Sequence, residues 1–215
     1  MGIGGIGMSA LARYFKVMGY EVAGYDRTPS PLTRKMTDEE GFEITYEDEV
    51  KNIREVFQDK EHTLVVYTPA VPKENRILSF FRDNGYALHK RAEVLGFLSR
   101  SKKALCVAGT HGKTTTTTML AFLLHHSHVG CSAFLGGISS NFGTNLLIDK
   151  DSDYVVIEAD EYDRSFLHLH PEIAVITAMD ADHLDIYGTH EHLIEAFEEF
   201  ALQTRGELFL RRGWN

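Results

Sequence analysis

The feature that most restricts the fold of this chain is the segment 106–120, which reads CVAGTHGKTTTTTML. An apolar run ends in a turn with two glycines, and Lys113 and Thr114 follow at the start of a helical pattern. In a strand, glycine loop and helix of this order, backbone amides and the helix N-terminus face phosphate oxygens, and the lysine reaches the outer phosphates. The spacing GTxGKT is shorter than the usual GxxxxGKS/T, because Val107 stands where that pattern has glycine. The segment predicts a nucleotide-phosphate site on a parallel sheet.

Short β-rich runs alternate with helical patterns along the chain, which is typical of a parallel α/β fold. The expected strands lie at 21–25, 64–70, 104–109, 131–137, 153–160 and 172–180. A short basic stretch at 99–104 separates the first series from a second one that starts with its own glycine turn. We therefore predict two domains, a Rossmann-like domain at 1–100 and a P-loop NTPase-like parallel α/β domain at 101–215 that is incomplete.

Two amphipathic helices are expected from their apolar spacing. The first ends at Gly19, and the second begins near Thr189. Their apolar faces are formed by Leu11, Tyr14, Phe15 and Met18 in the first helix, and by Leu193, Ile194, Phe197, Phe200 and Ala201 in the second.

The composition limits the class of protein. With 43% apolar residues, the 215-residue chain can bury substantial cores. Its formal net charge of −9 argues against a general nucleic-acid or anionic-membrane surface. No apolar run approaches the ~20 residues of a membrane span, and the N-terminus has no charged region followed by an apolar stretch and a cleavage site. Cys106 and Cys131 lie in apolar runs, which indicates buried free thiols in a reducing, cytoplasmic compartment.

A second glycine turn lies at the N-terminus, where residues 2–7 read GIGGIG and fit GxGxxG. Such a turn normally links a buried strand to a helix so that backbone amides approach a diphosphate, yet here Met1 directly precedes it. Asp26 ends the next strand nineteen residues beyond Gly7, close to the ~20-residue spacing at which an acid meets a ribose hydroxyl. The turn and Asp26 alone would indicate a nicotinamide-dependent oxidoreductase, but hydride transfer has no need of the other phosphate loop.

Two acidic segments follow apolar strands, and both come after the phosphate loop. The first segment supplies Glu158, Asp160, Glu161 and Asp163, and the second supplies Asp180, Asp182, His183 and Asp185. A nucleotide phosphate needs a cation, and such a cation takes oxygen ligands. In open α/β sheets, ligands gather at the carboxyl ends of the strands, where the loop and both segments fall. A solvated acidic loop is the alternative for either segment alone, and the two together favour a metal-nucleotide site.

These motifs together resemble the Mur ligase family. The stretches AGTHGKTTTTTML, EADEYDRSFLHL and DADHLDIYG are similar to its ATP-binding domain. The opening GIGGIGMSALA and the later GYDRTPSP, YTPAVP and HKRAEVL are similar to its UDP-sugar domain. The resemblance covers nearly the whole chain, in order. The GIGGIG motif at the N-terminus and the THGKTTTT motif limit the resemblance to the family members that add L-alanine or that recycle murein tripeptide.

The resemblance implies an ATP-dependent ligase of peptidoglycan synthesis. In the implied reaction, L-alanine is condensed with the lactyl carboxylate of UDP-N-acetylmuramate. The carboxylate oxygen first takes the γ-phosphoryl group of ATP, and the alanine amine then attacks the acyl phosphate. A ligase that recycles murein tripeptide is the alternative within the family. A non-catalytic nucleotide-binding module is the alternative from another class of function.

The resemblance also implies the roles of individual residues. Lys113 neutralises charge on the β- and γ-phosphates, and Thr114 and Glu158 bind one Mg²⁺. His183 binds a second cation near the acceptor and is, with Lys113, an expected catalytic residue; a structural cap is its alternative. The expected ATP-binding residues are Gly109, Thr110, His111, Gly112, Lys113, Thr114 and Thr115. The expected UDP-substrate residues are Gly4, Gly5, Ile6, Gly7, Asp26 and Arg91. A solvated helix start is the alternative for Arg91.

Both ends of the chain look cut in comparison with the family. The family has an apolar strand before GIGGIG and a third domain that receives the amino acid. A missing first strand would leave its neighbours in the sheet without ladder partners. We therefore expect a fragment that binds nucleotide but does not ligate.

Three histidines, at 125, 126 and 128, suggest a zinc cluster at first sight. The alternative is that these histidines, at the C-terminus of a helix, only contact solvent and the negative end of the helix dipole, and this explains their position equally well.

Overall fold

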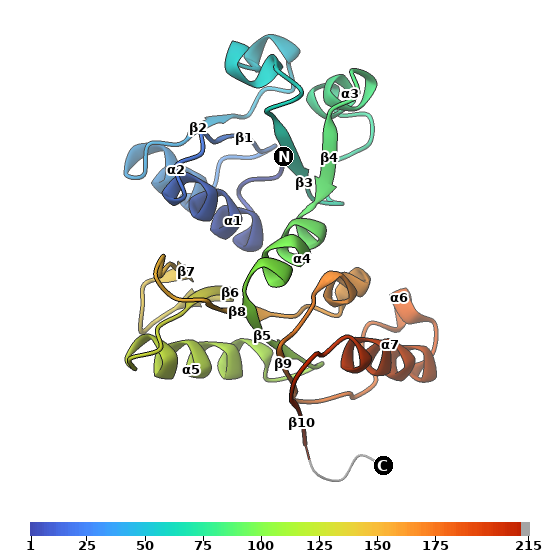
Figure 1. The fold of residues 1–215 in the computed structure, drawn as a ribbon. Coiled ribbons are helices and arrows are strands. Elements are labelled where there is room, and N and C mark those ends of the chain that lie inside the picture. The colour runs from blue at the N-terminus through green and yellow to red at the C-terminus, as the bar shows by residue number, and fades with distance from the viewer. Residues whose placement is uncertain (212–215) are drawn as a thin grey trace. The chain divides into compact units, whose positions relative to one another are not determined.

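The computed structural model describes residues 1–211, and Figure 1 shows their fold. The chain forms two compact units, Met1–Val94 and Leu95–Asn215. The boundary predicted between residues 100 and 101 falls within helix α4 (Arg91–Ser101), and it stays a prediction. Residues 212–215 of the second predicted domain lie outside the described residues. Within residues 1–211, no helix is both long and apolar enough to cross a membrane.

The first unit contains two small parallel sheets. Its elements before α4 are α1 (Ile6–Val17), β1 (Ala23–Tyr25), α2 (Pro31–Asp38), β2 (Glu43–Thr45), the 3-10 turns η1 (Val50–Asn52) and η2 (Glu55–Gln58), β3 (Leu64–Tyr67), α3 (Arg76–Asp83) and β4 (Ala87–Lys90). Strand β1 pairs with β2, and β3 pairs with β4. Helices α2 and α3 provide the crossovers that parallel pairing requires, so each sheet is a β-α-β unit.

An apolar groove of about 360 Å³ in the first unit is lined by residues from both sheets. Its lining includes Met1, Ile3, Ala23, Tyr25, Leu64 and Val65. The backbone amides of Gly2 and Ile3 donate to the Tyr25 carbonyl of β1 at 2.8 and 3.1 Å. The α-amino group of Met1 donates to the Val66 carbonyl of β3 at 2.7 Å. Residues 1–3 thus bridge β1 and β3, which belong to separate sheets. A strand that leads into the glycine turn is expected at this place, between β1 and β3.

The second unit is built on one six-stranded sheet. Its strands are β5 (Lys103–Ala108), β6 (Ser132–Ser139), β7 (Thr144–Leu147), β8 (Tyr154–Glu158), β9 (Ile173–Ile176) and β10 (Leu208–Leu210). The order is β10-β9-β5-β8-β6-β7; β7 is antiparallel to β6, and the other pairs are parallel. Its helical segments after α4 are α5 (Lys113–His125), the 3-10 segment η3 (Tyr162–His168), α6 (Leu184–Tyr187) and α7 (His190–Leu202). The predicted α/β class with parallel sheets is confirmed.

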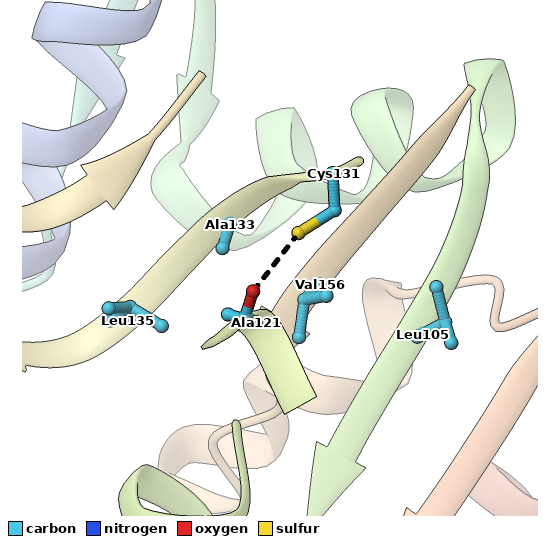
Figure 2. Close-up of a cluster of buried hydrophobic side chains, with 6 residues drawn as sticks. All are labelled: Leu105, Ala121, Cys131, Ala133, Leu135 and Val156. Atoms are coloured by element: carbon cyan, nitrogen blue, oxygen red, sulfur yellow. Dashed lines mark hydrogen bonds between the residues drawn. The ribbon is translucent and has the colours of Figure 1, made fainter. Parts of the chain in front are cut away.

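One hydrophobic cluster of the second unit lies between α5 and the centre of the sheet. Figure 2 shows its buried side chains, which are Leu105, Ala121, Cys131, Ala133, Leu135 and Val156. The Sγ atom of Cys131 donates to the Ala121 carbonyl at 3.7 Å. Cys106 and Cys131 are both free and buried, as predicted. Burial raises the pKa of the Cys131 thiol to about 11, and burial also raises the pKa of the Cys106 thiol.

The two predicted amphipathic helices are α1 and α7. Helix α1 buries Leu11 and Tyr14, and Gly19 follows it with a left-handed backbone (φ +92°). Helix α7 begins after Thr189, whose side chain accepts a hydrogen bond from a backbone amide of the first turn. Two phenylalanines of α7 pack on the fully buried Phe166 of η3. This contact fixes the segment that follows β8, where part of the predicted site lies.

Candidate functional site

The register of the second sheet brings three strand ends together. Val107 of β5 lies opposite Glu158 of β8, and Ala108 of β5 lies opposite Ile176 of β9. Because the strands are parallel, the segments that follow them leave the sheet at the same edge. The phosphate loop and the two acidic segments predicted from the sequence are these three segments.

The loop between β5 and α5 has a preformed shape. Gly109 (φ +133°) and Gly112 (φ +81°) both have left-handed backbones that other residues rarely adopt. The segment after β9 holds the loop: the Thr110 amide donates to the Ala178 carbonyl at 2.9 Å, and the Thr177 hydroxyl donates to the last carbonyl of β5 at 3.0 Å. The free amides at the start of the 13-residue helix α5 follow this loop, which is the arrangement that binds phosphate.

Lys113 is anchored at two points. Its Nζ atom donates to the Gly109 carbonyl at 2.7 Å and to Glu161 Oε1 at 2.8 Å. The Lys113 side chain is 15% exposed, whereas the Glu161 side chain is fully buried. Of the other predicted loop residues, Thr110 is buried, and His111 and Thr115 are exposed.

Thr114 and Glu158 are in direct contact. The Thr114 hydroxyl donates to Glu158 Oε1 at 2.9 Å, and the Gly136 amide donates to Glu158 Oε2 at 2.9 Å. Burial raises the pKa of Glu158, and these two hydrogen bonds oppose that shift. A cation would offset the charge of a partly buried carboxylate. A hydroxyl and a carboxylate are hard oxygen ligands, so this pair fits Mg²⁺.

His183 lies at the start of α6 with a left-handed backbone (φ +51°). Its Nε2 atom is 3.5 Å from Glu161 Oε1, and its Nδ1 atom is 3.9 Å from Asp182 Oδ1. Its ring packs edge-to-face on Tyr162, with 5.5 Å between centroids. The side chain makes no capping hydrogen bond to α6. The structure therefore brings His183 toward Lys113 through the shared carboxylate of Glu161.

No three His, Cys, Asp or Glu side chains within residues 1–211 are grouped so that they could hold a metal. A cation at Thr114 and Glu158 would therefore need phosphate oxygens or water as its other ligands. A groove of about 420 Å³ runs beside this pair, along the first turns of α5 and the β6–β7 connection. Its lining includes Thr114, Thr115, Thr118, Ile138, Ser139 and Asn141.

The predicted diphosphate residues come together within the first unit. Gly5 is the N-cap of α1, and the amide of Gly4 donates to Asp26 Oδ2 at 2.7 Å. A Cβ at Gly4 would lie 2.8 Å from the same carboxylate oxygen, and a Cβ at Gly7 would overlap the Arg91 guanidinium. Arg91 thus lies across the first turn of α1, where its positive charge adds to that of the helix N-terminus. An arginine and a helix N-terminus thus lie together, beside the Asp26 carboxylate, on a chain with a net negative charge.

The histidines at the C-terminal end of α5 form an aromatic cluster. His126 packs on Phe122 with 4.2 Å between ring centroids, and His125 and His126 both contact the Phe142 ring. The His126 Nδ1 atom lies 2.9 Å from the Phe122 carbonyl oxygen. These contacts are with rings and backbone of the same unit.

The sequence did not reveal the partner of Lys113. Glu161 lies in an acidic run with Asp160 and Asp163, and that run was interpreted as a set of cation ligands. Within it, only the three-dimensional structure shows that Glu161 turns inward while Asp160 accepts from the Tyr162 amide at 3.1 Å. The supporting role of Thr177, which follows β9, was also missed, because a threonine after a strand carries no distinctive signal.

Comparison with known families and proteins agrees with this geometry. Residues 1–103 match the family described as "Mur ligase family, catalytic domain", and residues 107–209 match the "Mur ligase middle domain". The chain is 59% identical to a protein of Phocaeicola vulgatus and 55% identical to one of Porphyromonas gingivalis, both named UDP-N-acetylmuramate--L-alanine ligase. Each match covers 99% of this chain and 47% of the relative. The chain thus spans about half the length of these relatives.

Among the solved structures that match nearly all of the chain are two ligases. One is a UDP-N-acetylmuramate-alanine ligase from Thermotoga maritima, with a TM-score of 0.82 and 33% identity, covering 97% of this chain and 47% of that one. The other is a UDP-N-acetylmuramate:L-alanyl-gamma-D-glutamyl-meso-diaminopimelate ligase from Neisseria meningitides, with a TM-score of 0.85 and 25% identity, covering 100% of this chain and 70% of that one. With two successive family domains matched in order, the chain belongs to the Mur ligase family.

Proposed function

We propose that this chain supplies the ATP and UDP-sugar sites of a ligase that joins L-alanine to the lactyl carboxylate of UDP-N-acetylmuramate. The observation that carries the proposal is the Thr114–Glu158 hydrogen bond beside Lys113, at the edge where three parallel strands end. A lysine, a hydroxyl and a carboxylate arranged around a phosphate loop are what phosphoryl transfer from Mg·ATP requires. The names of the relatives at 59% and 55% identity give the same two substrates, UDP-N-acetylmuramate and L-alanine.

In the proposed reaction the loop amides and Lys113 bind the β- and γ-phosphates. Thr114 and Glu158 are the residues that would hold Mg²⁺, which when bound offsets charge on the transferred phosphoryl group. A carboxylate is a poor electrophile, so its oxygen first attacks the γ-phosphorus and ADP leaves. The alanine amine then attacks the acyl carbon, and phosphate leaves. We propose His183 for a second cation near the acceptor.

In the first unit, we propose that the UDP diphosphate binds at the N-terminus of α1. The observations that support this are the N-terminus of α1, which begins after Gly5, and the guanidinium of Arg91, which lies against Gly7 in its first turn. We also place the protein in the cytoplasm, where both nucleotides are available and free thiols such as Cys106 and Cys131 stay reduced.

A ligase that accepts a tripeptide instead of alanine is the second candidate. It is favoured by the match to the Neisseria meningitides ligase, which has a TM-score of 0.85. That match has 25% identity, compared with 59% for the alanine ligase of Phocaeicola vulgatus. We therefore rank the alanine ligase first.

The nucleotide site is tested by calorimetric titration of the chain with ADP, with and without Mg²⁺. We expect Mg²⁺ to tighten ADP binding to the wild-type chain. Thr114→Ala is expected to reduce the gain in ADP affinity from Mg²⁺ about tenfold or more, because the hydroxyl that would hold the cation is lost. Thr116→Ala, on the same helix but outside the proposed site, is the matched control. Equal Mg²⁺ dependence in all three proteins would contradict the assigned site.

The sugar-nucleotide site is tested with two ligands that the glycine turn could accept. UDP-N-acetylmuramate is expected to bind more tightly than NAD, and Arg91→Met is expected to weaken the former on the order of tenfold, because one charged contact to the diphosphate is lost. Arg34→Met removes an exposed arginine of α2 and serves as the control. Tighter binding of NAD would favour an oxidoreductase instead.

A further inference from the structure

Glu161 is a fully buried carboxylate beside the phosphate loop. Its Oε1 atom accepts from Lys113 Nζ at 2.8 Å and lies 3.5 Å from His183 Nε2. Its Oε2 atom is also buried and has no hydrogen-bond partner within residues 1–211. A buried carboxylate requires a counter-charge, and the ammonium group of Lys113 supplies it.

The position of Glu161 is fixed by its surroundings. The Tyr187 hydroxyl donates to the Glu161 carbonyl at 2.6 Å. Burial, followed by the nearby Glu161 charge, raises the pKa of Tyr187 to about 12, so this hydroxyl stays protonated and donates. Asp163 and Arg164 follow with left-handed backbones (φ +53° and +55°). Such conformations persist only where the surrounding structure enforces them, so Glu161 is held in the site.

The ammonium group of Lys113 has three N–H donors. One donates to the Gly109 carbonyl and one to Glu161, which leaves a third for a ligand. If Lys113 left Glu161 to reach a phosphate, a buried carboxylate would remain without its main counter-charge, and this is strongly unfavourable. The lysine is therefore expected to keep both contacts and to use its third donor for the nucleotide.

We infer that Glu161 is a specificity-determining residue that makes the phosphate loop select the cation-bound form of its nucleotide. This inference rests on the proposed function. The buried carboxylate neutralises the charge of Lys113 while it orients the ammonium group. Metal-free nucleotide then meets a neutral Lys113–Glu161 pair and the carboxylate of Glu158, and its phosphates are poorly compensated. A divalent cation at Thr114 and Glu158 supplies the missing positive charge.

The test compares Glu161→Gln with the wild-type chain. Glutamine keeps an oxygen that can accept from Lys113 but removes the negative charge. We measure the dissociation constant of ADP in EDTA and the dissociation constant of ADP with saturating Mg²⁺. The ratio compared is the constant in EDTA divided by the constant with Mg²⁺. Glu161→Gln is expected to lower this ratio about tenfold, mainly through tighter binding of metal-free ADP. Glu40→Gln is the control, because Glu40 forms a partly buried ion pair with Arg13 in the first unit.

Each outcome decides between distinct explanations. An unchanged ratio in Glu161→Gln, or equal weakening of both forms of ADP, would mean that Glu161 is only a structural partner, and the inference would be wrong. If the wild-type chain does not bind Mg·ADP at all, the proposed function fails first. An equal change of the ratio in Glu40→Gln and in Glu161→Gln would also overturn the inference. The loss of any carboxylate would then change the Mg²⁺ dependence of ADP binding, whatever its position.

A second measurement does not depend on the folding of a variant. It is the structure of the wild-type chain crystallised with Mg·ADP and with a non-hydrolysable ATP analogue. Lys113 Nζ is expected to remain within hydrogen-bond distance of Glu161 Oε1 while it also contacts a phosphate oxygen. A lysine that has moved away from Glu161 to the phosphates would refute the inference.

Discussion

Replacing Lys113 by methionine is expected to destabilise the second unit by about 3–5 kcal/mol, because it leaves the buried Glu161 carboxylate without its counter-charge. The same change is expected to weaken Mg·ADP binding on the order of 100-fold, because the donor to the outer phosphates is lost. The double variant Lys113→Met with Glu161→Gln removes the unpaired charge. Its stability should recover most of the loss, while its nucleotide affinity should stay low.

Urea denaturation and ADP titration of the same preparations separate these two effects. Lys102→Met is the matched control, since Lys102 Nζ donates to the Ser152 carbonyl at 2.6 Å and not to a carboxylate. If the single variant unfolds at the same urea concentration as the wild-type chain, Lys113 and Glu161 do not form the pair described. If the double variant regains nucleotide binding, Lys113 is not the phosphate donor.

In a protein that begins at Met1, stability is expected to rise by up to about 4 kcal/mol between pH 5 and pH 8. Burial lowers the pKa of the Met1 α-amino group from 8.0 to about 5, with a smaller opposing effect from Asp26. Between these values the unfolded chain binds a proton that the folded chain does not, so stability increases with pH. Below pH 5 the amine is charged in both states and the full penalty applies. Above pH 8 it is neutral in both and the penalty disappears.

An added segment before Met1 distinguishes this effect from other titrations. Five alternating valine and isoleucine residues would convert the amine into an amide, and they could pair with β1 and β3 and fill the apolar groove of about 360 Å³. We expect higher stability at pH 6 by about 2 kcal/mol or more and a flatter pH profile. A Gly-Ser extension of equal length is the control. Equal stability with both extensions would show that the groove does not accept a strand.

The fold could be predicted where residues are buried on a regular period. The apolar runs at 104–109 and 153–160 gave strands β5 and β8, because a parallel strand covered on both faces is continuously apolar. Strands β2, β4 and β10 were missed because each has only three or four residues and carries little pattern. The antiparallel turn from β6 into β7 was also missed, since its glycines and serines indicate a loop and give no strand direction.

The candidate site was predictable only in part. Glycine spacing identified the loop, and the residue types around it indicated a cation and a phosphate. The pairing of Lys113 with Glu161 was not predictable, because it depends on left-handed residues at 163 and 164 that turn an acidic segment inward. The contact of Arg91 with Gly7 likewise joins residues far apart in the sequence. Such contacts follow from packing, which local sequence patterns do not encode.

The hydrogen bonds from Thr110 and Thr177 give the phosphate loop its shape without a ligand. Its conformational entropy is lost when the chain folds and not when nucleotide arrives. Association should then be governed by encounter and desolvation, with little loop rearrangement. Differences in affinity among nucleotides should accordingly appear in how long each one stays bound.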